Sequence, residues 1–129
     1  DNGILVVTVP NDFSELQEKL LVEGDIPERF WIALPDHLSY FTADTLNATA
    51  EAMGWSCQTI MADFPIDLFL AHQGSNYVMD KNNGPDAHRA RLMLEKLIGD
   101  KGDDLANRFY ESLADVGLGR NITGFLQPG

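Results

Sequence analysis

The pattern of apolar and polar positions along the chain predicts an α/β fold with about three strands. The first apolar run, ILVVTV from Ile4 to Val9, is continuous and rich in β-branched residues, which is typical of a strand buried on both faces. Two later segments have strand-like patterns, from Ser56 to Ala62 and from Asn121 to Gln127. The segments between these strands have the periodicity of helices, so we expect helices packed around a small sheet.

Four segments have apolar residues at helical spacing, and each ends at a glycine. They span residues 13–24, 42–54, 85–99 and 103–117. In the first, the apolar face consists of Phe13, Leu16, Leu20 and Leu21. In the last, it consists of Leu105, Phe109 and Leu113. We also predict a short helix at 66–70, because Pro65 precedes it, and a break at 82–85 where Asn-Asn-Gly-Pro stands.

The helix after Thr42 has the clearest boundaries. Thr42 is a favourable N-cap residue, and Phe41 and Leu46 occupy the positions of a hydrophobic staple around it. Its predicted buried stripe is Leu46, Ala50 and Met53. The loop before it, residues 25–41, is rich in aromatic residues and contains the stretch PDHLSYF. At the start of the chain, Asn2-Gly3 predicts a tight turn, so we expect the fold to continue upstream of it.

Length and charge limit the classes of function. A chain of 129 residues fits a single domain, 1–129, and its net charge of −11 argues against nucleic acid or an anionic membrane surface as a partner. No apolar run approaches the roughly 18 residues that a membrane span needs, and no basic leader opens the chain, so a cytoplasmic location is the expectation.

Motifs for metal or nucleotide binding are absent from the sequence. The three histidines His37, His72 and His88 lack metal-ligand spacing, so we expect no metal site. The single cysteine, Cys57, lies in a predicted strand and is expected to be a buried structural thiol. The Gly-Leu-Gly stretch at 117–119 lies between a helix and a strand, whereas a dinucleotide loop lies between a strand and a helix. The residues alone therefore name no reaction.

The ordered set GILVVTVPND followed by PDHLSYFTADTLNATAEAMGW resembles the C-terminal half of the class I S-adenosylmethionine-dependent methyltransferases. In that family a glycine-ended turn leads into the fifth strand, and a His-x-x-Tyr-Phe loop, a helix and an aromatic-ended turn precede the sixth. His37, Tyr40, Phe41, Gly54 and Trp55 match that pattern. Segments 64–77 and 86–97 resemble a helical insertion of members that act near sugar and cell-envelope biosynthesis, and GLGRNITGFLQ resembles the final strand.

The resemblance implies a partial Rossmann-like methyltransferase domain. The family places its last strand antiparallel between the fifth and the sixth, so three strands are expected here. The Gly-rich loop and the acidic residue that hold S-adenosylmethionine belong to the N-terminal half, so we expect no cofactor-binding residue in this chain and no activity from it alone. The strand at Ile4 to Val9 would then have an unprotected apolar edge, through which we expect self-association.

The same resemblance implies that this half recognises the methyl acceptor, a small molecule such as a sugar or a sugar-linked metabolite. We expect the substrate-binding residues to be Asn11, Asp12, Phe30, Trp31, His37 and Tyr40. His37 is the candidate general base, because histidine exchanges protons near neutral pH. Tyr40 would orient an acceptor hydroxyl, and the two other aromatic residues would stack on a flat face of the substrate.

Two further interpretations are open. The chain is a non-enzymatic acidic interaction module if these features are all packing. Alternatively, it is a substrate-recognition subunit that completes a methyltransferase in trans. The coding sequence upstream of Asp1, and a co-purifying partner that carries the Gly-rich half, would distinguish these interpretations.

Overall fold

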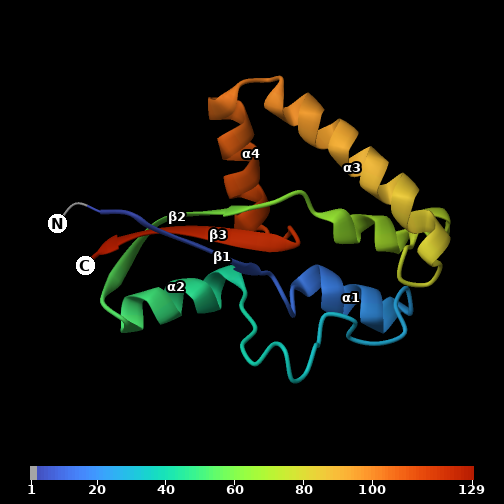
Figure 1. Cartoon of the computed structure of the whole chain (residues 1–129), viewed down its shortest axis with the longest axis horizontal. Helices are drawn as coiled ribbons and strands as arrows, with labels where there is room; N and C mark the ends of the chain where they lie inside the picture. The colour runs from blue at the N-terminus through green and yellow to red at the C-terminus, as the bar shows by residue number, and fades with distance from the viewer. Residues whose placement is uncertain (1–2) are drawn as a thin grey trace.

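The structure, a computed structural model, describes residues 3–129 and contains a three-stranded antiparallel sheet (Figure 1). Its strands are β1 (Leu5–Pro10), β2 (Trp55–Ala62) and β3 (Asn121–Pro128), in the order β1-β3-β2. The central strand β3 is antiparallel to both neighbours, so β1 and β2 run parallel to each other on either side of it. The prediction of three strands with the last one antiparallel is confirmed.

The helices lie where the periodicity predicts them. They are α1 (Glu15–Glu23), α2 (Ala43–Ala52), α3 (Gly84–Gly99) and α4 (Asp103–Asp115). Three short 3₁₀ segments link β2 to α3, namely η1 (Ile66–Ala71), η2 (Gln73–Ser75) and η3 (Lys81–Asn83). The predicted break at 82–85 includes the start of α3, since proline is tolerated in a first helical turn. The turn predicted at Asn2-Gly3 includes a residue outside the described range.

Side-chain caps fix where α1 and α2 begin. Ser14 caps α1 and forms a capping box with Gln17, and Thr42 caps α2 and forms one with Thr45. In each box the N-cap hydroxyl accepts a backbone N–H bond that the first turn cannot satisfy internally. Phe41 packs against the core cluster that includes Leu46, as the predicted staple requires. These caps place both helix starts beside the loop that follows β1.

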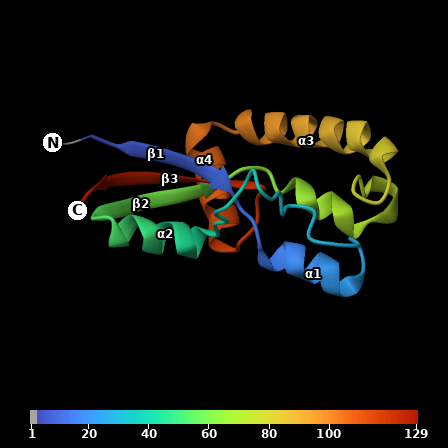
Figure 2. The same cartoon turned by 60° about the horizontal axis from the view of Figure 1, so that its bottom comes forward.

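Two hydrophobic clusters hold the elements together. The first lies between the sheet, α2 and α4, and its buried members are Leu46, Ala62, Leu113, Ala114 and Ile122. The second joins α1, the 24–40 loop and η1, and its buried members are Leu20, Ile26, Trp31 and Leu70. Figure 2 shows α2 along one side of the sheet, while α1 and α3 lie beyond the ends of the strands. None of the helices within residues 3–129 is long and apolar enough to cross a membrane.

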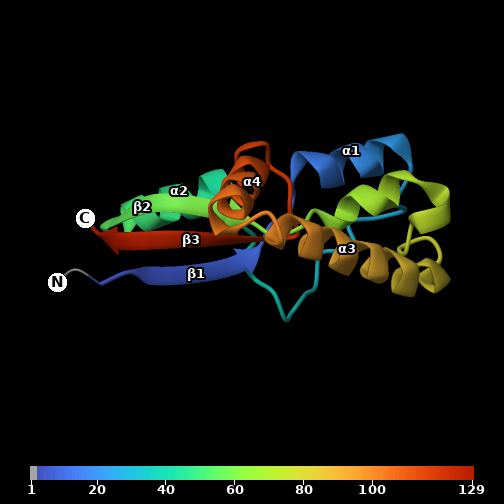
Figure 3. The same cartoon turned by 90° about the horizontal axis from the view of Figure 1, so that it is seen from above.

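The predicted burial of the first strand is wrong. Exposed fractions are 60% for Ile4, 41% for Leu5 and 53% for Val6. The reason is position, because β1 is an edge strand (Figure 3), and Val7 and Val9 are its side chains that pack against the first core cluster. An apolar run of residues shows that a strand can be buried on both faces, but the position of the strand in the sheet determines whether its side chains are buried.

Three smaller burial predictions also fail. Met53 is 72% exposed, because α2 ends at Ala52 and Met53 is already its C-cap. In α4, Leu113 is buried, but Leu105 and Phe109 of the same predicted face are exposed, since Ala106 and Ala114 face the core in their place. The Cys57 thiol is half-buried rather than fully buried, and burial, followed by the charge of Glu51, raises its pKa.

Candidate functional site

Polar side chains gather at the end of the sheet where β1 and β2 finish and β3 begins. Asn11 and Asp12 follow β1, Asp63 follows β2, and Arg120 precedes β3. Parallel strands end at the same edge of a sheet, and an antiparallel strand between them begins there. Three segments far apart in the sequence thus supply one cluster.

Asn11 is buried and fastens the turn that leads into β3. Its side-chain amide donates to the carbonyl oxygens of Gly119 at 3.0 Å and Gly117 at 3.4 Å. Its backbone N–H donates to the carbonyl of Arg120 at 2.9 Å, which continues the pairing of β1 with β3. Both donors of the amide therefore serve the protein itself.

Asp12, which is buried, and Arg120, which is half-buried, form an ion pair at the same edge. The guanidinium Nη1 donates to Asp12 Oδ1 at 2.7 Å, and the Asp12 backbone N–H donates to the carbonyl of Phe41. Burial acts to lower the pKa of Arg120, but the hydrogen bond to Asp12 and the charges of Asp67 and Asp12 outweigh it and raise the pKa. The guanidinium also lies over the Phe30 ring, 5.9 Å from its centroid.

A second buried carboxylate, Asp67 of η1, lies near this ion pair. It accepts a hydrogen bond from the Tyr77 hydroxyl at 2.8 Å and one from Gln17 Nε2 at 3.2 Å. Burial first, and then the charge and hydrogen bond of Asp67, raise the pKa of Tyr77 well above its ordinary value. This network ties α1 to the segment after β2.

Aromatic rings occupy the space beside these polar groups. Phe13 makes edge-to-face contacts with Trp31 and Tyr40 at centroid distances of 5.6 and 5.5 Å, and Phe30 contacts Trp31 at 5.4 Å. Trp31 is only 3% exposed and belongs to the second core cluster. A ring buried on both faces offers no surface for a substrate to stack on, so the packing interpretation describes Trp31 here.

The PDHLSYF loop is held by its tyrosine. The Tyr40 hydroxyl accepts the backbone N–H of Ala33 and donates to the carbonyl of His37, both at 3.1 Å. The His37 backbone N–H donates to the carbonyl of Ala33 at 2.8 Å, while its imidazole is exposed. Among residues 3–129 no hydrogen bond to that imidazole is formed. The Tyr40 hydroxyl therefore stabilises the conformation of the loop, and the His37 ring is accessible to a ligand.

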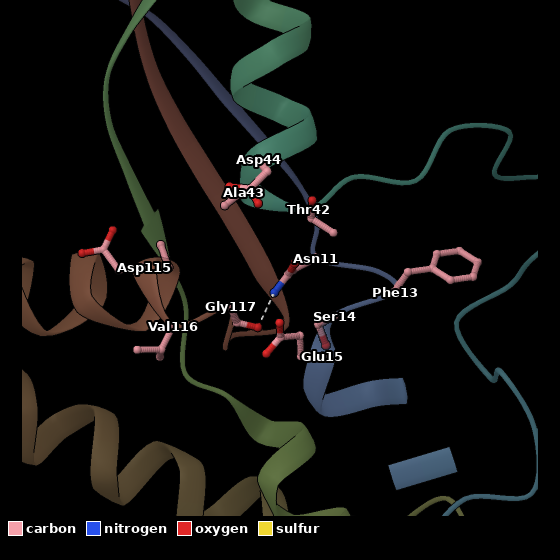
Figure 4. A pocket seen from close by; sticks show the side chains of 11 residues that line it. Asn11, Phe13, Ser14, Glu15, Thr42, Ala43, Asp44, Asp115, Val116 and Gly117 are labelled. Atoms are coloured by element: carbon pink, nitrogen blue, oxygen red, sulfur yellow. Dashed lines mark hydrogen bonds between the residues drawn. The ribbon is translucent and has the colours of Figure 1, made fainter. Parts of the chain in front are cut away.

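A pocket of about 320 Å³ opens between the starts of α1 and α2 and the end of α4 (Figure 4). Its lining residues are Asn11, Phe13, Ser14, Glu15, Thr42, Ala43, Asp44 and 114–117. In Figure 4 the Asn11 amide points toward Gly117 and the Phe13 ring points away from the pocket. Of the six predicted substrate-binding residues, only Asn11 lines it.

The pocket presents acceptor groups and no cationic side chain. Glu15, Asp44 and Asp115 supply carboxylates, and Thr42 and Ser14 supply hydroxyls that already cap the two helices. Such a lining suits a ligand that donates hydrogen bonds, such as a polyhydroxylated or amine-bearing molecule. Within the described range no group of histidine, cysteine, aspartate or glutamate side chains could hold a metal ion.

The described residues do not fit S-adenosylmethionine. The loops after β1 and β2 contain no glycine, and the side chains of Asn11, Asp12 and Asp63 each hydrogen-bond to protein partners. A loop of that kind cannot bring several backbone N–H groups around a cofactor.

Part of this arrangement was predictable from the sequence. The predicted substrate site groups Asn11 and Asp12 with residues of the PDHLSYF loop, and the structure joins the two segments through the Asp12–Phe41 hydrogen bond at 2.9 Å. Asp63, Asp67, Tyr77 and Arg120 were missed, because their partners lie far away along the chain and follow no local pattern. For the pocket residues at 42–44 and 114–117, the sequence indicated a helix start and a helix end but not a pocket.

Comparison with known proteins gives no assignment. No family model matches the chain, and neither the curated proteins nor the solved structures contain a significant match.

Proposed function

We propose that this chain is the C-terminal, acceptor-recognising part of an S-adenosylmethionine-dependent methyltransferase that acts on a small molecule. The observation that carries the proposal is the sheet order, with β3 antiparallel between two mutually parallel strands. That order is the one implied by the sequence resemblance around PDHLSYF and the Gly54-Trp55 turn. Sequence motifs and strand topology are separate observations, and both favour the same family.

The acceptor would bind in the pocket between α1, α2 and α4. Its carboxylates, Glu15, Asp44 and Asp115, can accept hydrogen bonds from sugar hydroxyls, and its volume of about 320 Å³ suits one sugar ring with a substituent. His37 does not line the pocket, but it is our candidate for the general base because its ring is exposed in the loop that leads to Thr42 of the pocket. Tyr40 would act by holding that loop, through Ala33 and the His37 carbonyl.

The cofactor site has to come from other residues. It would precede Asp1 in the same polypeptide, or a partner protein would supply it in trans. We derive no methyl-transfer step from the chain itself, since its residues do not fit the cofactor.

The decisive observation is the coding sequence upstream of Asp1. The proposal expects a strand followed by a Gly-rich loop there, or a co-purifying protein that carries one. Calorimetric titration of S-adenosylmethionine should show no micromolar binding to the isolated chain and clear binding to the completed protein. Micromolar binding to the isolated chain would show that the division into two halves is wrong.

In the completed protein, His37→Ala should lower kcat at least tenfold with little change in KM if histidine removes the acceptor proton. Glu15→Gln is the matched variant at the pocket, and it should raise KM instead. Because His37 is exposed, its substitution should leave the fold intact, and circular dichroism of each variant checks this. Unchanged turnover of His37→Ala would remove the general-base role and leave the family proposal standing.

A second candidate is a non-enzymatic interaction module. Exposed apolar side chains in the aromatic loop favour it, since Leu34 is 70% and Leu38 is 80% exposed. An upstream coding sequence without a cofactor half, together with a stable protein partner, would favour this candidate over the methyltransferase.

A further inference from the structure

The outer edge of β1 has hydrogen-bonding groups that no described residue satisfies. The register Leu5↔Leu126 to Pro10↔Asn121 continues to Asn11, whose backbone N–H donates to Arg120 in the β3 direction. The next residue, Asp12, donates its N–H to Phe41 on the opposite side. Because strand residues alternate, Ile4, Val6 and Thr8 also direct their N–H and C=O groups away from β3.

This free edge is short and has a defined end. Pro10 carries no N–H, and the segment at Phe41 already occupies the edge beyond it. In the part of the chain that the structure describes, no backbone bond outside the sheet involves Ile4, Val6 or Thr8. The open groups therefore belong to these three residues, with Val6 at their centre.

The edge is also uncharged and apolar. No ionisable side chain lies between Gly3 and Asn11, although the whole chain carries a net charge of −11. Ile4, Leu5 and Val6 are between 41% and 60% exposed. Natural edge strands usually carry a lysine, a bulge or a covering element that prevents pairing, and within residues 3–129 none of these protects residues 4–8.

We infer that two copies of this chain pair antiparallel through β1, with Val6 opposite Val6 of the second copy. This register uses every open group, because Ile4 then faces Thr8 of the second copy and Thr8 faces its Ile4. Leu5 and Val7 lie on the opposite face of β1 from Val6, and they become cross-strand neighbours of each other across the two-fold axis. The result is a continuous six-stranded sheet.

Charge and topology both favour a second copy as the occupant. An uncharged strand offers a charged peptide partner no counter-charge, whereas an identical strand meets it without repulsion at the contact. The other edge of the sheet is β2, against which α4 packs. A two-fold contact uses the same edge of both copies, so it closes at a dimer rather than growing into a fibre.

The inference concerns this chain on its own and can be tested without measuring methyl transfer. A strand supplied by a longer protein would occupy the same backbone groups, so the experiment uses the 129-residue chain. A contact between two short strand edges is smaller than the standard protein interface of about 1,600 Å², so we expect micromolar rather than nanomolar affinity.

Sedimentation velocity over a range of protein concentrations tests the register. We expect the wild-type chain to shift from monomer to twice the mass of 14.3 kDa, and Val6→Lys and Val6→Glu each to remain monomeric. The two-fold axis places like charges opposite each other in either variant, and an equimolar mixture of the two should restore the dimer. Val22→Lys, at an 80% exposed site on α1, should dimerise like wild type.

Circular dichroism and urea unfolding of each Val6 variant establish that it is folded before its mass is interpreted. A wild-type chain that stays monomeric would overturn the proposal, and so would dimers of the single Val6 variants. Assembly beyond the dimer would contradict the closed contact. Failure of the folded mixture to dimerise would show that Val6 is not on the axis.

Discussion

At the scale of single residues, the Tyr77 hydroxyl has the most strongly shifted pKa among the described residues. It donates to the buried carboxylate of Asp67, which also accepts from Gln17, so deprotonation would place two negative charges side by side. Burial and that neighbouring charge raise the pKa of Tyr77. The consequence is a defined loss of stability at alkaline pH.

Below about pH 10 the phenol keeps its proton in both the folded and the unfolded chain, so its contribution to stability is constant. Above that pH the unfolded chain releases the proton while the folded one retains it. The free energy of unfolding then falls by up to about 1.4 kcal/mol per pH unit. In Tyr77→Phe this part of the decline should disappear, although the variant is less stable at neutral pH because Asp67 loses a donor.

Urea unfolding of both proteins between about pH 9 and about pH 11 measures the two slopes, and the comparison cancels the other groups that titrate there. Equal slopes would show that Tyr77 loses its proton as readily in the folded chain as in the unfolded one.

At the scale of elements, the turn between α4 and β3 is fixed by two glycines with different surroundings. Both have positive φ, 73° at Gly117 and 100° at Gly119. A Cβ on Gly117 would meet nothing within 4 Å, whereas one on Gly119 would lie 2.5 Å from Ala62 Cβ and 2.9 Å from the Asp63 carbonyl oxygen. Asp63 has little freedom to move, because its backbone N–H and its carboxylate both bond to Asn121.

Alanine substitutions at these positions separate backbone strain from steric conflict. Gly117→Ala should lower the free energy of unfolding by about 1 kcal/mol, the cost of an L-residue at positive φ. Gly119→Ala should lower it by about 2–4 kcal/mol, because overpacking against Ala62 adds to that strain. Denaturant unfolding of both variants gives the difference, and equal losses would mean that the Ala62 contact relaxes without cost.

The elements themselves were largely predictable, and their surroundings were not. The caps at Ser14 and Thr42 and the helical spacing of α1 to α4 are local features, so a short window of sequence contains them. Val6 is exposed because β1 has a neighbouring strand on one side only among the described residues. The sequence around residue 6 contains no information about that position in the sheet. For the same reason the Asp12–Arg120 ion pair, whose partners are more than a hundred residues apart, could not be predicted from the sequence. The loop that contains Asn11 could be predicted, because it directly follows a strand pattern.

At the scale of the whole molecule, the net negative charge opposes the association of two copies, whereas the uncharged edge of β1 favours it. The net charge of −11 makes two copies repel each other at long range, while β1 contributes no charge to the contact itself. Added salt shortens the screening length from about 30 Å at 0.01 M to about 10 Å at 0.1 M. Salt should therefore weaken the repulsion and leave the strand pairing untouched.

We accordingly predict that the dissociation constant of the β1-mediated dimer falls several-fold as sodium chloride rises from about 0.01 M to about 0.1 M. Sedimentation equilibrium of the wild-type chain measures it, and Val22→Lys provides a control whose net charge is one unit less negative and whose dimer should depend slightly less on salt. For the mixed dimer of Val6→Lys with Val6→Glu, the dissociation constant should fall less on adding salt, because salt also screens the attraction between the two new charges. A wild-type dimer that dissociates on adding salt would mean that ion pairs, rather than the neutral strand edges, hold the two copies together.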